Sequence, residues 1–321
     1  MGNTKKMRFK LLFVVFLIAL SSCEKQNHFD DLPYVTVEGI VNNNYILDMA
    51  IDANNIKWFA TTGGLVKLTG SSTTVYKRAQ GMDCDTLTKV TIDANGDVWC
   101  ITYKASILQF NGISFIVHKP STPSVPSMLQ PTAITIDNNN HVIVSTMHGL
   151  YTYNGSHWSV YYFKIPLEVN NITNLCKHPL YPNNILVTQD DNKRFTFDGK
   201  SIKPLDSIMG YPSDSVRCLT TDANGKIYCG IYKRGLLVPD NPSPHILSLG
   251  NDWSDNAISA IAIASNNRIW VATVNGIVYI DNGNINRYLP RRLPMDHVEH
   301  IRLDRNNKLW FYNMAGVYTI E

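Results

Sequence analysis

Charged residues are scarce in this sequence, and beyond residue 22 they form no dense basic cluster. Asp, Glu, Lys and Arg make up 17% of the 321 residues, with 29 Lys and Arg against 26 Asp and Glu. Residues 1–22 hold four of the basic residues and no acidic one, so the remainder carries 25 basic and 26 acidic residues, a net charge of −1. Domains that bind nucleic acid need a basic surface. We therefore expect no nucleic-acid partner.

Cysteine is too scarce to suggest a disulfide framework or a metal site. Of six cysteines, five follow Cys23: Cys84, Cys100, Cys176, Cys218 and Cys229. An odd number cannot all pair, and no Cys/His spacing typical of a zinc site occurs. Four of the five stand where the repeats described below place small apolar residues. We expect buried free thiols, with no metal and no other cofactor.

Long apolar runs are absent, apart from one near the N-terminus. Residues Leu11–Leu20 are apolar and follow a basic lead that contains Lys5, Lys6, Arg8 and Lys10. The run is too short to span a bilayer as a permanent helix, and it has the layout of a secretory signal. We expect residues 1–22 to be a signal peptide.

The run ends in Leu20-Ser21-Ser22-Cys23, which resembles a bacterial lipobox. The resemblance implies cleavage before Cys23 and acylation of its thiol, and two or more acyl chains anchor a protein stably. We expect an acylated tether at residues 23–33 and membrane attachment through this lipid. Glu24-Lys25-Gln26 lacks the aspartate that retains some lipoproteins in the inner membrane, which favours an outer-membrane lipoprotein of the cell envelope. The alternative is a plain secretory signal with an incidental cysteine.

A segment of about ten residues, clearest as Val90–Trp99, recurs seven times along the rest of the chain. A bulky residue stands six places after the turn aspartate or its equivalent, at Trp58, Trp99, Ile143, Leu186, Tyr228, Trp270 and Trp310. The steps between these positions are 41, 44, 43, 42, 42 and 40 residues. A period near 42 built from short β segments indicates a propeller.

Each repeat divides into four short strands. In the second repeat we expect them at Lys89–Ile92, Val98–Thr102, Ile107–Phe110 and Ser114–His118, with a hairpin turn at Asp93–Gly96. The seventh repeat ends after its third strand, and Tyr34–Val37 precedes the first repeat. We expect this N-terminal segment to supply the missing strand, which closes the ring. The sequence thus predicts an all-β fold, a single seven-bladed β-propeller over residues 34–321 closed by an N-terminal strand.

The repeat pattern is apolar-x-apolar-Asp-x-x-Gly-x-apolar-Trp, followed by small-x-Thr and Gly-apolar. It resembles the two-component regulator propeller repeat, most closely at Trp58–Leu65 and Trp270–Ile277. In that family, tandem repeats form the extracytoplasmic sensor of hybrid histidine kinases. No membrane span or kinase follows the last repeat here, so we expect the recognition half without the signalling half.

Residues that recur in most repeats serve the fold, whereas residues that break the pattern are candidates for function. By this test Asp93–Asp97 is a hairpin turn and not a calcium loop, because it offers too few oxygen ligands. Trp253 breaks the pattern in a polar loop before the sixth repeat, flanked by Asp255 and Asn256. An aromatic side chain among short polar residues suits stacking on a ligand. Trp158 alternates like an outer strand, so we expect it at a blade edge.

The innermost strands contain a second set of exceptions. Small residues are usual there, but four ionisable residues replace them in neighbouring repeats: Asp48, Lys89, His300 and Arg302. We expect them to line one sector of the central channel. They form either an ion-pair cluster that holds the ring closed or a polar wall that orients a ligand's hydroxyl or carboxylate.

The loops between second and third strands are irregular and offer Tyr103, Lys104, His148, Tyr232, Lys233 and Arg234. With Trp253 they favour a non-enzymatic binding propeller whose partner is a glycan or an envelope protein. The alternative is a propeller lyase or hydrolase, similar in architecture to streptogramin lyase, with a histidine on the same face, such as His148, His297 or His300, as general base. A scaffold subunit of an outer-membrane complex is a third possibility.

Overall fold

The computed structural model describes residues 34–36, 44–120, 130–146, 149–162, 172–177, 185–189, 194–212, 215–239, 243–288, 297–314 and 316–320. The predicted signal peptide and tether, with Cys23, lie outside the described residues. So does His148. Within the described ranges, no helix has the length and apolar character needed to cross a membrane.

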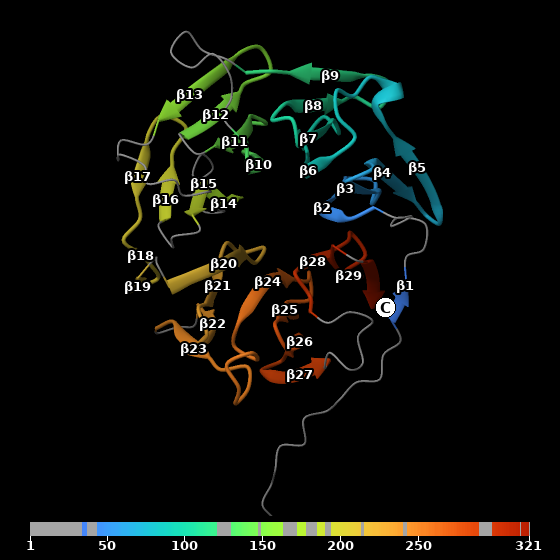
Figure 1. The fold of residues 1–321 in the computed structure, drawn as a ribbon. Coiled ribbons are helices and arrows are strands. Elements are labelled where there is room, and N and C mark those ends of the chain that lie inside the picture. Colours follow the sequence, from blue (N-terminus) through green and yellow to red (C-terminus); the bar gives the residue numbers. More distant parts are fainter. Residues whose placement is uncertain are drawn as a thin grey trace, which may run out of the picture.

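Seven four-stranded antiparallel sheets surround a central axis as the blades of a propeller (Figure 1). Blade one contains β2 (Ile46–Ile51), β3 (Lys57–Thr61), β4 (Gly64–Thr69) and β5 (Ser72–Tyr76). Blade two contains β6 (Leu87–Ile92), β7 (Val98–Thr102), β8 (Ile107–Phe110) and β9 (Phe115–His118). Blade three contains β10 (Ala133–Ile136), β11 (Val142–Thr146), β12 (Gly149–Tyr153) and β13 (Trp158–Tyr162). The strands expected in the second repeat are confirmed to within two residues.

The remaining blades follow in the same order. Blade four contains β14 (Ile172–Lys177), β15 (Ile185–Gln189), β16 (Arg194–Phe197) and β17 (Ile202–Pro204). A two-stranded hairpin of β18 (Ser207–Ile208) and β19 (Tyr211–Pro212) leads to the next blade. Blade five contains β20 (Val216–Thr221), β21 (Ile227–Ile231), β22 (Gly235–Val238) and β23 (His245–Leu247). Blade six contains β24 (Ile258–Ile263), β25 (Ile269–Thr273), β26 (Gly276–Asp281) and β27 (Asn284–Tyr288).

Blade seven joins the two ends of the chain. It contains β28 (His300–Leu303), β29 (Leu309–Asn313), β30 (Gly316–Ile320) and, at its outer edge, β1 (Tyr34–Thr36). In Figure 1 the blue strand β1 lies beside the C-terminal end of the red chain. The two strands pair antiparallel, with Tyr34 opposite Ile320 and Thr36 opposite Tyr318. The predicted closure of a seven-bladed propeller by an N-terminal strand is therefore confirmed.

Turn aspartates hold the hairpins between the first two strands in blades one, two, three, five and seven. One carboxylate oxygen of Asp93 accepts the backbone N–H groups of Asn95 (2.8 Å) and Asp97 (3.0 Å), and the other accepts the indole N–H of Trp99 at 2.9 Å. The same indole bond recurs from Trp58 to Asp52 (3.3 Å) and from Trp310 to Asp304 (3.2 Å). The six-residue spacing in the sequence therefore reflects a hydrogen bond from each tryptophan to the aspartate of the turn before it.

Asparagines in these turns also tie neighbouring blades together. Asn55, Asn140 and Asn307 have φ angles of 63°, 62° and 61°, a left-handed conformation that asparagine tolerates. Their side-chain oxygens accept the N–H of Arg305 (2.9 Å), Ala94 (2.7 Å) and Ser265 (2.9 Å), respectively, each in the turn of the preceding blade. The first of these bonds crosses the ring closure.

The bulky residue of each repeat packs between blades, as expected. Trp58 of blade one meets Phe110 of blade two with ring centroids 6.0 Å apart, and Trp310 of blade seven meets Phe59 of blade one at 6.5 Å. The tryptophans at 58, 99, 270 and 310 are all nearly buried, at 2–6% exposure. Trp158 lies on the outer strand β13 beside Tyr153, which confirms its predicted place at a blade edge.

The five cysteines among the described residues are free, and four of them belong to this packing: Cys100, Cys176, Cys218 and Cys229. Burial raises the pKa of Cys218 to about 12 and that of Cys176 to about 11. It also raises the thiol pKa of Cys100 and Cys229, which are both fully enclosed. These thiols are protonated at neutral pH and act as small apolar side chains.

Candidate functional site

One face of the propeller carries both the segments that lead into the innermost strands and the loops between second and third strands. Backbone hydrogen bonds join the two in each of several blades, as from Tyr103 to Thr86 (2.9 Å) and from Tyr232 to Ser215 (2.7 Å). We call this the upper face. Six of the eleven exposed large hydrophobic side chains in the described residues lie on it: Tyr45, Tyr103, Tyr232, Trp253, Val274 and Met314. Single exposed apolar side chains are ordinary on a protein surface, so the informative residues among these six are those that lie together.

Trp253 and Tyr232 come together on the upper face, from blades six and five. The ammonium of Lys233 lies 5.4 Å from the centre of the Trp253 ring and 5.0 Å from that of Tyr232. The guanidinium of Arg217, on β20, covers the Tyr232 ring at 4.2 Å. Both rings stay open to solvent, at 57% and 47% exposure. We name Arg217, Tyr232, Lys233 and Trp253 the aromatic platform.

A tight turn between β21 and β22 presents Tyr232 and Lys233 to this platform. The N–H of Arg234 bonds to the carbonyl of Ile231 at 3.0 Å, and Lys233 at the corner has a φ of 53°. Glycine and asparagine are the usual residues in this left-handed region, and a lysine there carries some backbone strain. Arg234 follows and is exposed on the same turn. The sequence pattern pointed to the loop of Tyr232, Lys233 and Arg234 but gave no sign of Arg217.

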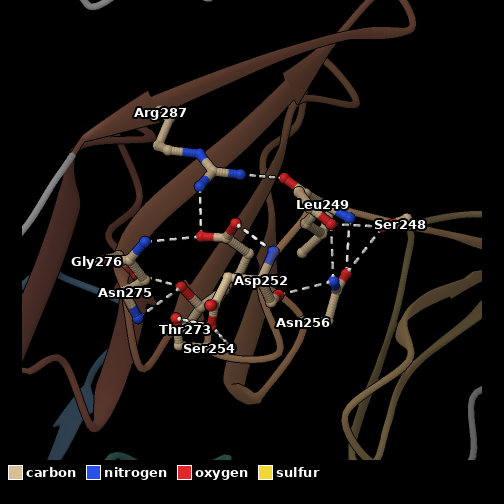
Figure 2. Close-up of polar contacts among 11 residues, drawn as sticks. Ser248, Leu249, Asp252, Ser254, Asn256, Thr273, Asn275, Gly276 and Arg287 are labelled. Carbon is tan, nitrogen blue, oxygen red and sulfur yellow. Dashed lines mark hydrogen bonds and ion pairs between the residues drawn. The ribbon is translucent and has the colours of Figure 1, made fainter.

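The loop that carries Trp253 is held in place by Asn256 (Figure 2). The side-chain oxygen of Asn256 accepts the N–H of Leu249 (2.8 Å) and the hydroxyl of Ser248 (3.3 Å). Its amide donates to the carbonyls of Gly250 (2.9 Å) and Asp252 (3.1 Å). The side chain is 8% exposed, so it fixes the loop from within.

Asp255 holds the other side of the same loop. Its carboxylate pairs with the guanidinium of Arg287, which reaches over from β27 and also donates to the carbonyl of Leu249 (Figure 2). The amide of Asn275 donates to the same carboxylate at 2.7 Å. A Cβ atom on Gly250 would lie 2.2 Å from a carboxylate oxygen of Asp255, so the chain needs glycine here.

The predicted ligand contacts at this loop therefore divide into two kinds. Trp253 is exposed, as a ligand contact requires. Asp255 and Asn256 are buried at 5% and 8%, and protein donors occupy their oxygens. The structure places these two side chains as supports of the loop and not on its surface.

A cleft of about 1070 Å³ lies beside the loop, between the outer parts of blades five and six. Its polar lining includes Ser248, Asn251, Asn282, Asn284 and Asn286. The two arginines in its wall are neutralised: Arg287 pairs with Asp255, and Arg268 pairs with Asp281 at 2.6 Å. Sequence reasoning did not find this cleft, although the asparagine-rich stretch at 282–286 was a visible signal.

The ionisable residues of the innermost strands also meet, as expected. Asp48 accepts the N–H of Val90 from blade two (3.1 Å) and the hydroxyl of Tyr312 from blade seven (3.3 Å). A guanidinium nitrogen of Arg302 lies 3.9 Å from the Asp48 carboxylate, and His300 stacks on Tyr312 at 4.9 Å. Asp48 thus links three blades across the ring closure.

The charge state of this cluster follows from its surroundings. Burial lowers the pKa of His300 to about 4, and the positive charges of Arg302 and Lys89 act in the same direction. His300 is therefore neutral at neutral pH. This geometry agrees with the closure role foreseen for the cluster; the alternative role as a ligand wall stays a prediction for Lys89 and Arg302.

Blade two carries a counterpart of the platform that lacks its partners. Tyr103 and Lys104 occupy the same places as Tyr232 and Lys233, because they follow the bulky residue of their repeat by four and five positions. Tyr103 is 78% exposed and Lys104 donates to the carbonyl of Asp83 at 3.4 Å. This tyrosine shares no cation with a second aromatic ring in the described residues.

Of the histidines proposed as general bases, two are described. His297 is exposed and lies 3.1 Å from the carboxylate of Glu299, whereas His300 is enclosed against Tyr312. Within the described part of the chain, no group of three or more His, Cys, Asp and Glu side chains is placed to hold a metal ion.

Residues 252–275 match the family model described as two component regulator propeller. The match begins in the Trp253 loop and ends just before β26. A comparison with curated proteins found no match.

Solved structures share the fold. The extracellular domain of the hybrid two component system BT3049 from B. thetaiotaomicron has a TM-score of 0.65 and 22% identity, over 86% of this chain and 40% of that chain. This chain thus spans about two fifths of the length of that sensor domain. Virginiamycin B lyase from Staphylococcus aureus, solved with quinupristin, has a TM-score of 0.68 and 12% identity over 90% of this chain and 99% of the lyase. YCF48 bound to a D1 peptide has a TM-score of 0.67 and 13% identity, over 91% of this chain and 97% of YCF48.

Identities this low establish a common fold and leave function open. The molecule is a seven-bladed β-propeller with a two-component regulator propeller repeat in blade six, and it resembles the sensor domains of hybrid two-component systems.

Proposed function

We propose that this chain is a lipid-anchored protein of the bacterial cell envelope whose propeller binds a saccharide on its upper face without transforming it. The aromatic platform of blades five and six carries the proposal. It presents the exposed ring of Trp253 beside the partly covered ring of Tyr232, and the faces of pyranose rings stack on such side chains. Its loop is fixed from below by Asp255 and Asn256, so little conformational entropy is lost when a ligand binds.

The cleft beside the loop extends this surface. Its amide and hydroxyl groups suit the hydroxyls of a sugar, and its charged residues are already paired with each other. A ligand that stacks on Trp253 and continues over the loop would meet Asn251 next. The likeness to sensor domains and the lipobox at Cys23 support an extracytoplasmic location and a role in recognition.

The test is a binding screen of the chain from residue 24 onward against immobilised oligosaccharides. We expect selective binding that Trp253→Ala reduces at least about tenfold, the scale of one lost aromatic stacking contact. Tyr103→Ala in blade two is the matched control and should bind like the wild type. A protein that binds no saccharide but retains an envelope protein in a pull-down would overturn the proposal.

The anchor is tested separately in cells. Full-length protein should incorporate a palmitate analogue and remain in the membrane fraction, and Cys23→Ala should lose both properties. Release of unlabelled wild-type protein into the soluble periplasm would instead indicate a plain secretory signal.

A further inference from the structure

Within the part of the chain that the structure describes, the aromatic platform carries positive charge that no carboxylate pairs with. Arg217, Lys233 and Arg234 are all exposed beside Tyr232 and Trp253. Among the described residues, none of these three cations forms an ion pair with a carboxylate. The arginines of the adjacent cleft differ, because both are paired with aspartates.

The exposed acid next to Trp253 in the sequence forms no ion pair with these cations. Asp252 precedes Trp253, but its carboxylate accepts the N–H and hydroxyl of Ser254, both at 2.8 Å. Asp252 is also one of the residues that line the cleft. The platform therefore combines open aromatic rings with an excess of cations.

Contact with an aromatic face orients a cation without cancelling its charge. Arg217 lies over Tyr232, and Lys233 lies between Tyr232 and Trp253, so their positions are fixed before a ligand arrives. The guanidinium of Arg217 has five N–H donors and the ammonium of Lys233 has three, and contact with a ring face does not occupy them all. Donors therefore remain available to a ligand. A preplaced guanidinium beside an ammonium is a ready receptor for a carboxylate or sulfate.

We infer that the ligand of the platform is an acidic saccharide, a pyranose that carries a carboxylate or a sulfate ester. This inference rests on the proposed function and adds the charge of the ligand to it. The sugar ring stacks on Trp253, and its anionic group lies against Lys233 and Arg217. Arg234 adds attraction at longer range, which falls as salt rises.

The test compares two ligands that differ only in charge: trigalacturonate and its fully methyl-esterified form. Calorimetry with the chain from residue 24 onward should show trigalacturonate binding at least about tenfold more tightly at low salt, the size of a charge-assisted contact. Lys233→Gln and Arg217→Gln should each bring the two affinities closer together. Lys104→Gln, the blade-two counterpart, should leave the ratio unchanged.

A sulfated disaccharide without carboxylate identifies the kind of anion. Tighter binding of this probe than of trigalacturonate, with the same loss in Lys233→Gln, also supports an acidic saccharide and selects the sulfate ester. Equal binding of the acid and its ester, both abolished by Trp253→Ala, would overturn the inference and leave the proposed function standing. A hexaglutamate peptide that binds as tightly as the sugars would overturn it too, since charge alone would then suffice. Failure of every saccharide, charged or neutral, would overturn the proposed function itself.

Discussion

Arg287 and Asp255 form an ion pair between the outermost strand of blade six and the loop that leads into its innermost strand. Their side chains are 13% and 7% exposed. The pair therefore joins the two edges of one blade and sets the position of Trp253 from a largely buried place beside the cleft. Within one loop, Asp255 thus supports the backbone while Trp253 is exposed to solvent.

Removal of Arg287 should destabilise this loop strongly. Arg287→Met leaves the buried carboxylate of Asp255 without its countercharge, and we expect a loss of about 3 kcal/mol in the free energy of unfolding. Denaturant titration measures it. The double variant Asp255→Asn/Arg287→Met should lose less than the sum of the two single changes. Strict additivity would show that the two side chains act independently.

The indole bond of the turn aspartates should be visible in stability. Asp93→Ala removes two backbone contacts of the turn and leaves the indole N–H of the nearly buried Trp99 unpaired, for a cost of about 2–3 kcal/mol. Asp222→Ala is the matched control, because Asp222 holds the same turn in a blade that has Tyr228 in place of tryptophan. We expect the control to lose about 1 kcal/mol less. Equal losses in thermal or chemical unfolding would remove the role assigned to the indole.

Stability should depend on pH through His300. Its pKa is lowered to about 4 in the folded protein, against about 6.5 in an unfolded chain. The unfolded state therefore binds more protons between these values, and stability is complete above pH 6.5 and falls as the pH drops toward 4. The shift corresponds to roughly 3 kcal/mol at most. His300→Asn should show a flatter stability curve over this range, and a slope identical to that of the wild type would contradict the assignment.

The cysteines of the blades should be unreactive in the native state. Cys100, Cys218 and Cys229 are buried and have raised pKa values, so little thiolate forms at pH 7. Native protein treated with iodoacetamide should remain unmodified at these positions, and protein in guanidinium chloride should react fully. Mass spectrometry of the digested protein distinguishes the sites. Rapid native labelling of Cys229 would show that blade five opens far more readily than its packing implies.

The sequence was sufficient for the fold because its signals are periodic. The aspartate and the tryptophan six places later recur together because their side chains form a hydrogen bond, as from Trp99 to Asp93. The seventh repeat has only three strands of its own, which predicts its pairing with β1. The turn contact joins residues close together in the sequence, so it appears as a regular spacing along the chain.

The site was only half visible, because its residues come together across blades. Trp253 stood out as an exception within one repeat, but its approach to Lys233 depends on the packing of blade six against blade five. Lys233 was named only as part of its loop, because the matching place in blade two also holds a lysine, Lys104, and nothing in the pattern showed that Lys233 lies between two aromatic rings. The burial of Asp255 was equally hidden, since its partner Arg287 is 32 residues further along the chain.

Hydrogen–deuterium exchange with and without trigalacturonate tests the central claim most directly, because it locates the binding surface without any substitution. Protection should appear in residues 230–235 and 250–256, the two segments of the platform, while residues 101–106 of blade two exchange as in the free protein. Protection of the turns on the opposite face, such as residues 93–97, with the platform unaffected, would contradict the account.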